Sequence, residues 1–93
     1  MSSDKYHDDI PSASEVRLRH LTVDEAMPKM EQFLHDAFVS GLYQVRVIHG
    51  KGTGKLRQQV RKELAHHPLV KSFRPGGYGE GGEGVTVVEL SDK

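Results

Sequence analysis

The sequence of 93 residues contains no cysteine, which excludes disulfide bonds and zinc sites built on thiolates. It also contains no apolar run close to the roughly 18 residues that a membrane-spanning helix needs, and its N-terminus shows no signal-peptide pattern. These absences predict a cytoplasmic protein with no membrane partner. A chain of this length is expected to fold as one domain around a small core.

The chain also lacks any excess of charge of one sign, because 13 Lys and Arg balance 13 Asp and Glu. The charges are nevertheless segregated. Residues 1–40 carry four cations and eight acids, whereas residues 41–74 carry eight cations and one acid, a net charge of +7. Salt screens charges that lie more than about 8 Å apart, so the distant acids cancel this field only in part. The sequence therefore predicts a basic face on a neutral protein.

The polar residues 1–14 have no apolar period and are predicted to form a disordered tail, which leaves residues 15–93 as the single domain. The segment "EVRLRHL" alternates apolar and polar residues, as short strands do. "TVDEA" is typical of a capping box, with Thr22 and Glu25 as the reciprocal pair, and predicts that a helix follows and stops near Gly41.

Further along, "YQVRVI" predicts a second strand and "GKLRQQVRKELAHH" a second helix that ends before Pro68. "LVKSF" and "VTVVEL" predict two more strands, separated by a glycine-rich loop. The order β-α-β-α-β-β predicts an α/β two-layer sandwich, in which two helices cover one face of a mostly parallel four-stranded sheet.

The segment "HGKGTG" falls at a predicted strand-to-helix junction, where free N–H groups and the helix dipole attract an anion. Its glycines allow close approach of a ligand to the backbone, and lysines add positive charge. The spacing fits neither a nucleotide-binding P-loop nor the dinucleotide fingerprint, so no nucleotide cofactor is expected. The phosphates of a nucleic acid backbone remain as the expected partner. The predicted contacts in this loop are Gly50, Lys51, Gly52, Thr53, Gly54 and Lys55.

Arg57 and Arg61 are four residues apart, so both project from one flank of the second predicted helix. They form either a solvated face or, beside the glycine loop, part of the phosphate site. Arg19 and Arg74 are predicted to extend that site. Tyr78, in the glycine-rich loop, could stack on an exposed base.

Four segments, "LTVDEAMPKMEQFLHDAF", "VRVIHGKGTGKLRQQVRKEL", "HPLVKSFRPG" and "GGEGVTVVEL", resemble in order and spacing the small MutS-related (Smr) domain family. The resemblance covers residues 15–90. It implies binding of DNA or RNA, and an endonuclease activity known from several members, with Mg²⁺ or Mn²⁺ as a candidate cofactor. It also implies a fold like the C-terminal domain of translation initiation factor three.

The first strand departs from the family pattern, which reads Leu-Asp-x-His or Leu-Asp-Leu-Arg followed by Gly. In this chain Arg17 replaces the Asp and His20 replaces the Gly. A cation thus stands where the resemblance implies a carboxylate for cleavage, which puts the usual route of cleavage in doubt. Two hypotheses follow, an endonuclease and a binding module that has lost cleavage. A third, a protein-interaction domain, would need no basic face.

His49, in the family's His-Gly-x-Gly motif, is the candidate catalytic residue, because imidazole titrates near neutral pH and could donate to a phosphate. The alternative is that His49 only shapes the loop through hydrogen bonds. Glu83, like Glu80 in the same loop, could replace the missing carboxylate, although acids in glycine loops are usually solvated.

Overall fold

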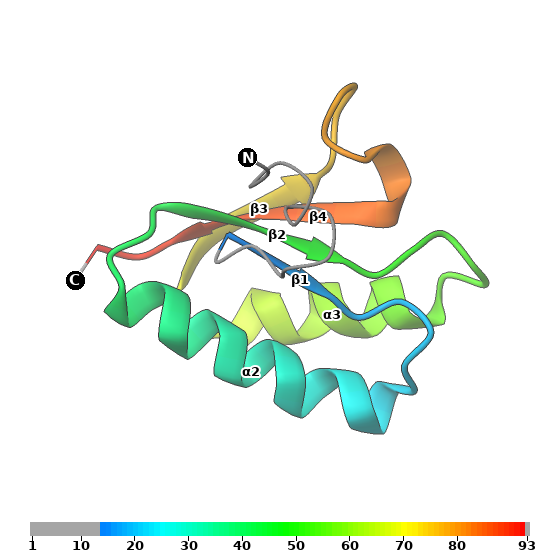
Figure 1. Cartoon of the computed structure of the whole chain (residues 1–93), viewed down its shortest axis with the longest axis horizontal. Coiled ribbons are helices and arrows are strands. Elements are labelled where there is room, and N and C mark those ends of the chain that lie inside the picture. The colour runs from blue at the N-terminus through cyan, green and yellow to red at the C-terminus, as the bar shows by residue number, and fades with distance from the viewer. Residues whose placement is uncertain (1–13, 93) are drawn as a thin grey trace, which may run out of the picture.

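The computed structural model describes residues 14–92, so the predicted tail, apart from Ser14, lies outside the described residues. The described chain contains two α-helices, one 3-10 turn and four strands (Figure 1). In chain order these are β1 (Glu15–Arg17), α2 (Val23–Val39), β2 (Gln44–Ile48), α3 (Lys55–His66), β3 (Val70–Pro75), η1 (Gly82–Gly84) and β4 (Val85–Leu90).

The four strands form one mixed sheet in the order β1-β2-β4-β3. Only β1 and β2 pair in parallel, and both pairings of β4 are antiparallel. The prediction of a mostly parallel sheet is therefore wrong. Strands β1, β2 and β3 do run in one direction, but β4 returns through the loop after β3 and inserts between β2 and β3. One reversed strand in a central position makes two of the three pairings antiparallel.

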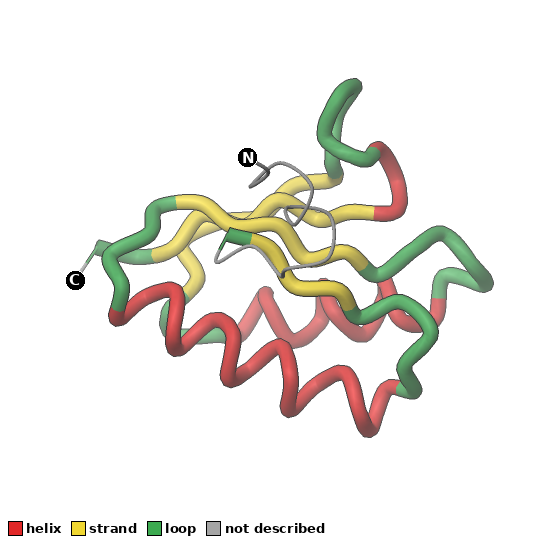
Figure 2. The backbone as a smooth tube through the Cα atoms, viewed as in Figure 1, coloured by secondary structure: helices red, strands yellow, loops and turns green. Residues whose placement is uncertain are grey.

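Both helices lie on the same side of this sheet, as predicted, and the opposite face is not covered by either helix (Figure 2). The core lies between the two layers and is built by alternation in the strands. On β2, Val45 and Val47 are buried toward the helices, while Arg46 points to the uncovered face. The helices contribute apolar stripes, and burial of each valine, leucine or methionine side chain in them stabilises the fold by about 1.5–3 kcal/mol. The fully buried helix residues include Ala26, Leu34, Val60 and Leu64.

The start of α2 confirms the predicted capping box. The Thr22 hydroxyl accepts a hydrogen bond from the Glu25 N–H at 3.2 Å, and the Glu25 carboxylate accepts one from the Thr22 N–H at 3.0 Å. Two N–H groups of the first turn are thereby satisfied, which fixes the point where the chain enters the helix.

Three loops meet at one end of the molecule, because β1, β2 and β3 end there and β4 begins there (Figure 1). They are residues 18–22, 49–54 and 76–84. The Gly84 carbonyl joins two of these loops, since it accepts hydrogen bonds from the N–H groups of His49 and Gly50 at 3.0 and 2.9 Å. Within residues 14–92 no helix has the length and apolar character to cross a membrane.

Candidate nucleic-acid interface

The glycine loop between β2 and α3 adopts a conformation that few other residues could adopt. Gly50, Gly52 and Gly54 have φ angles of 80°, 30° and 87°, all in the left-handed region. Gly54 is also the N-cap of α3 and has no side chain to accept from the first turn. In the described part of the chain, the N–H groups of Leu56 and Arg57 have no acceptor, and they remain available to an external anion.

A groove of about 310 Å³ lies between this loop and the β1–α2 loop. We call it the phosphate groove. Three cations, Lys51, Lys55 and Arg57, line it, and no acid does. The loop lies between β2 and α3, as predicted, and it brings positive charge and free N–H groups together. The remaining lining residues are His20, Leu21, Thr22, Val23, His49, Gly50, Gly52, Thr53, Gly54 and Leu56.

His49 lies at the inner wall of the phosphate groove and is only 5% exposed. Its Nδ1 atom lies 2.9 Å from the Gly50 carbonyl oxygen, which can only accept, so Nδ1 carries the proton. Burial lowers the pKa of His49, the Gly50 carbonyl opposes this shift, and the charges of Arg61 and Arg57 add to it. The neutral ring is therefore the favoured form, and its Nε2 atom is an acceptor.

The partner of His49 Nε2 is Thr86, a fully buried residue of β4 that sequence reasoning did not select. The Thr86 hydroxyl donates to Nε2 at 2.9 Å and accepts from Arg61 Nε at 3.4 Å. A polar residue within the apolar run "VTVVEL", on the side that faces the helices, was the signal that could have identified it. The result is a continuous chain of hydrogen bonds from α3 through β4 to the glycine loop.

This chain of hydrogen bonds occupies both ring nitrogens of His49 and so supports the loop-shaping alternative over acid–base chemistry. Because the C=O and N–H of a trans peptide point in opposite directions, anchoring the Gly50 carbonyl on the buried ring turns the Lys51 N–H outward. His49 thus orients a potential anion donor. A catalytic role for His49 stays a prediction.

The other predicted site residues do not all meet in the phosphate groove. Arg57 Nη1 lies 4.0 Å from Glu83 Oε1, across the gap between α3 and the β3–β4 loop. The Glu83 side chain is 82% exposed, so this long pair contributes little to stability. Glu83 is therefore near a predicted phosphate contact, but it faces solvent.

Arg74 lies on the uncovered face of the sheet, because it pairs with Val87, which also pairs with Arg46. It forms a bidentate ion pair with Glu80, with N···O distances of 2.7 and 2.9 Å. This pair, together with the Gly77 N–H, lowers the pKa of Glu80 to about 2. Tyr78, in the same loop, is fully exposed.

The sequence profile of the Smr domain matches residues 16–91 of this chain. The chain belongs to the Smr domain family. It is 57% identical over 77 residues to Endonuclease MutS2 of Caldicellulosiruptor saccharolyticus, covering 83% of this chain and 10% of that protein. Identity to Endonuclease MutS2 of Symbiobacterium thermophilum is 55% over 78 residues, covering 84% of this chain and 10% of that protein. The chain thus spans about a tenth of the length of these relatives.

Two solved structures share the fold of this Smr domain. The crystal structure of the Smr domain of Thermus thermophilus MutS2 superposes with a TM-score of 0.81 at 50% identity, covering 84% of this chain and 98% of that one. YdaL, a stand-alone small MutS-related protein from Escherichia coli, gives a TM-score of 0.81 at 28% identity, covering 89% of this chain and 67% of that one. The likeness to translation initiation factor three stays a prediction.

The donor groups of this Smr domain do not fit a resident divalent cation. Among residues 14–92 no group of three or more His, Asp or Glu is placed to hold a metal ion. Arg17 adds a cation at the end of β1, and the Lys29 ammonium donates to the Arg17 carbonyl at 3.1 Å. Mg²⁺ and Mn²⁺ prefer several oxygen ligands, which this region does not bring together. The described residues therefore do not support the Mg²⁺ or Mn²⁺ that the resemblance implies, and this cofactor stays a prediction.

Proposed function

We propose that this Smr domain binds the phosphates of a nucleic acid backbone in the phosphate groove. The proposal is supported by the composition of this one groove. It contains three cations and the free N–H groups of α3, and no acid lines it. Each of these features stabilises a bound anion, and together they define a site for an oxygen that carries negative charge.

A backbone phosphate fits this groove better than a nucleotide cofactor. The glycine spacing departs from both nucleotide-binding fingerprints, and the cations continue along α3 beyond the groove, where Arg61 contacts Thr86. A row of cations matches a row of phosphates, as in the backbone contacts that position a protein on nucleic acid. The relatives named Endonuclease MutS2 support the same class of ligand.

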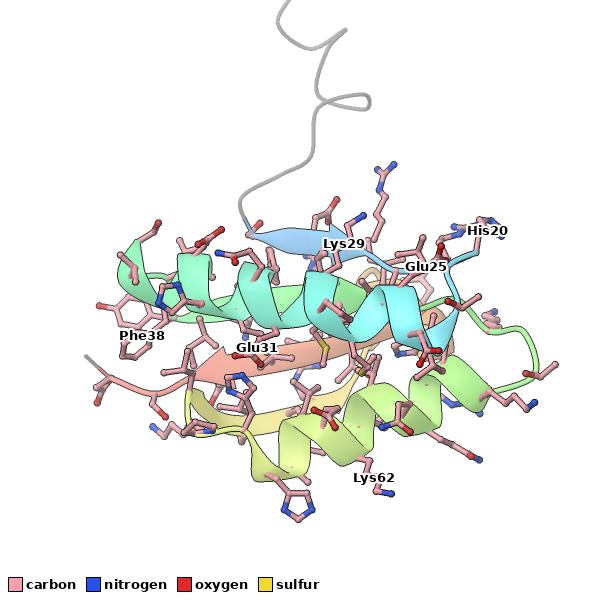
Figure 3. The ribbon with its side chains drawn as sticks, turned by 90° about the horizontal axis from the view of Figure 1, so that it is seen from below. His20, Glu25, Lys29, Glu31, Phe38 and Lys62 are labelled. Carbon is pink, nitrogen blue, oxygen red and sulfur yellow. The ribbon has the colours of Figure 1, made fainter. Side chains whose placement is uncertain are left out.

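The salt dependence of binding tests this proposal. With about four phosphate contacts, the logarithm of the affinity for a labelled duplex should fall with the logarithm of salt concentration at a slope near −3.6. Arg57→Ala should weaken binding to all sequences and reduce the slope by about 0.9. Lys62→Ala is the matched control, because Lys62 projects from α3 away from α2 and the sheet (Figure 3), and it should change little. Affinity that does not depend on salt would refute the proposal.

A second candidate function is nicking of a phosphodiester, and the name of the relatives favours it. Hydrolysis needs a base for the attacking water and an acid for the leaving oxygen. In this domain both ring nitrogens of His49 form hydrogen bonds with protein groups, and the charged guanidinium of Arg17 cannot act as a base. The groove supplies cations and N–H donors, which stabilise the extra negative charge of the transition state without transferring a proton. Binding is therefore the better-supported function.

Supercoiled plasmid and a structured RNA, each with magnesium, manganese or chelator, separate the two functions. Nicking by the wild type that a folded His49→Ala variant lacks would establish an endonuclease that depends on His49. Salt-dependent binding without nicked product in any of these conditions would identify a domain that only holds nucleic acid.

A further inference from the structure

The uncovered face of the sheet carries a second groove, which none of the functions above uses. Its volume is about 570 Å³, within the range of about 300–1,000 Å³ typical of small-ligand sites. It lies between the ends of β1 and β2 and the β3–β4 loop, and Gly50 and Lys51 line both grooves. We call it the sheet-face groove. The two grooves are therefore neighbours that share one stretch of backbone.

The floor and the rim of the sheet-face groove differ in chemistry. Half-buried Ile48 and buried Val85, partners in the β2–β4 register, together with the Gly84 backbone, give an apolar floor. Exposed cations, Arg19, Arg46 and Lys51, stand at the rim. Such a groove suits a ligand with a flat apolar body and an anionic group.

Two acids also line the sheet-face groove, but they do not cancel its positive charge. Glu80 is committed to Arg74 by two short hydrogen bonds and to the Gly77 N–H by a third at 2.8 Å. Glu15 stands beside Arg46 in the β1–β2 register. The rim therefore has three cations and one carboxylate that is not paired with Arg74, that of Glu15, and its net charge is positive.

We propose that the sheet-face groove holds one unpaired nucleotide of a single-stranded segment whose adjoining phosphates lie in the phosphate groove. This inference rests on the proposed function. A base can lie on the floor of Ile48 and Val85 only if it is unpaired, because a base in a duplex is covered on both faces. Arg46 can stack its planar guanidinium on the exposed face of that base. Lys51 belongs to both grooves, so one side chain can contact the phosphate that joins the two positions.

A single strand suits this groove better than a protein segment does. The groove continues into the proposed phosphate site, its rim is positive, and the fully exposed Tyr78 on the neighbouring loop offers a further stacking surface. Stacking on side chains tolerates any base, so the groove should distinguish unpaired from paired nucleotides rather than one sequence from another.

The test compares three labelled probes of equal length, namely an oligothymidine, the same strand with abasic sites, and a duplex. The abasic strand keeps every phosphate but offers no base. We expect the wild type to bind the oligothymidine about 5- to 20-fold more tightly than the abasic strand, the gain from about one stacked base. Oligouridine should behave like oligothymidine, because the groove reads the flat base and not the sugar.

Two variants test whether the tighter binding of the oligothymidine arises in the sheet-face groove. Arg46→Ala should bind the oligothymidine and the abasic strand alike, and its duplex affinity should stay within about two-fold of the wild type. Arg57→Ala, in the phosphate groove, should weaken all three probes. Arg46 is exposed, so its removal leaves the core intact. In addition, titration with oligothymidine should shift the backbone amide resonances of Ile48, Gly79 and Gly81.

Each contrary result has a distinct meaning. Equal affinity of the wild type for the oligothymidine and the abasic strand would overturn the inference and leave the proposed function standing. The inference also fails if Arg46→Ala weakens the duplex as much as the single strand, because Arg46 would then supply charge alone. Absence of salt-dependent binding to every probe would overturn both the inference and the proposed function.

Discussion

Replacing Thr86 by valine should destabilise the domain, although valine is nearly isosteric with threonine and favours strands. The substitution removes the hydroxyl that donates to His49 Nε2 and accepts from Arg61 Nε. Loss of the hydrogen bond to Nε2 leaves a buried acceptor without a partner, which costs about 1–3 kcal/mol. The contact with Arg61 is longer and adds little, because the guanidinium can turn toward water. We therefore expect a loss of about 2 kcal/mol.

Urea unfolding followed by circular dichroism measures this loss. With a slope of about 1 kcal/mol per molar urea, at the low end for small proteins, the midpoint should fall by about 2 M. Thr86→Ser is the matched control, since it keeps the hydroxyl and removes one methyl group, at a cost of about 1 kcal/mol. The hydrogen-bond account requires valine to be the more damaging of the two. If Thr86→Val were as stable as the wild type while Thr86→Ser was destabilised, packing alone would explain Thr86 and the account would be refuted.

Two further perturbations concern histidines at the phosphate groove. The folded-state pKa of His49 lies below its usual 6.5, so below that pH the unfolded chain binds a proton that the folded chain does not. Stability should therefore be unaffected above pH 6.5 and fall on acidification by up to about 1.4 kcal/mol per pH unit. This slope, measured by urea unfolding from pH 8 to 5, should shrink in His49→Gln. His20 is the one non-glycine residue in the described chain with a positive φ, 73°. His20→Gly should therefore raise the free energy of unfolding by about 0.5–1 kcal/mol, which would appear as a higher thermal midpoint. A lower midpoint would contradict strain at that position.

The elements that the sequence predicted well are those decided by neighbouring residues. The pair of Thr22 and Glu25 marks the start of α2, and His67 before Pro68 ends α3, because both signals act within one helical turn. The antiparallel pairing of β3 with β4 could have been predicted, because no α-helix lies between these two strands and a parallel pair needs a crossover connection. The insertion of β4 beside β2 depends instead on pairing between segments more than 30 residues apart, such as Val47 with Thr86, which local patterns do not contain.

The candidate site shows the same division between local and long-range information. The position of glycines and lysines at a strand-to-helix junction follows from residues 49–54 themselves, and it was predicted, whereas anion binding at this loop stays a prediction. The distribution of the arginines over two faces was not. Val45 and Val47 point to the helices, so Arg46 between them had to point to the opposite face, and the pairing of β3 with β4 places Arg74 there too. A prediction that groups cations because they are close in the sequence therefore assigns the arginines of the uncovered face and those of α3 to one site, although they lie on two different surfaces.

The faces of the sheet also bear on cleavage. Val16 and Leu18 are buried toward the helices, so Arg17, which is exposed and pairs with Ile48, points to the uncovered face. His49 follows Ile48 and contacts Thr86 on the side of the helices. Position 17 and the His49 ring therefore lie on opposite sides of the sheet, where a carboxylate and an imidazole would not share one phosphate as base and acid. Arg17 does not line the phosphate groove, and it adds a cation beside the sheet-face groove. An arginine at position 17 in place of the carboxylate that the resemblance implies is therefore compatible with the proposed binding, because it extends the basic surface on which a single strand would lie.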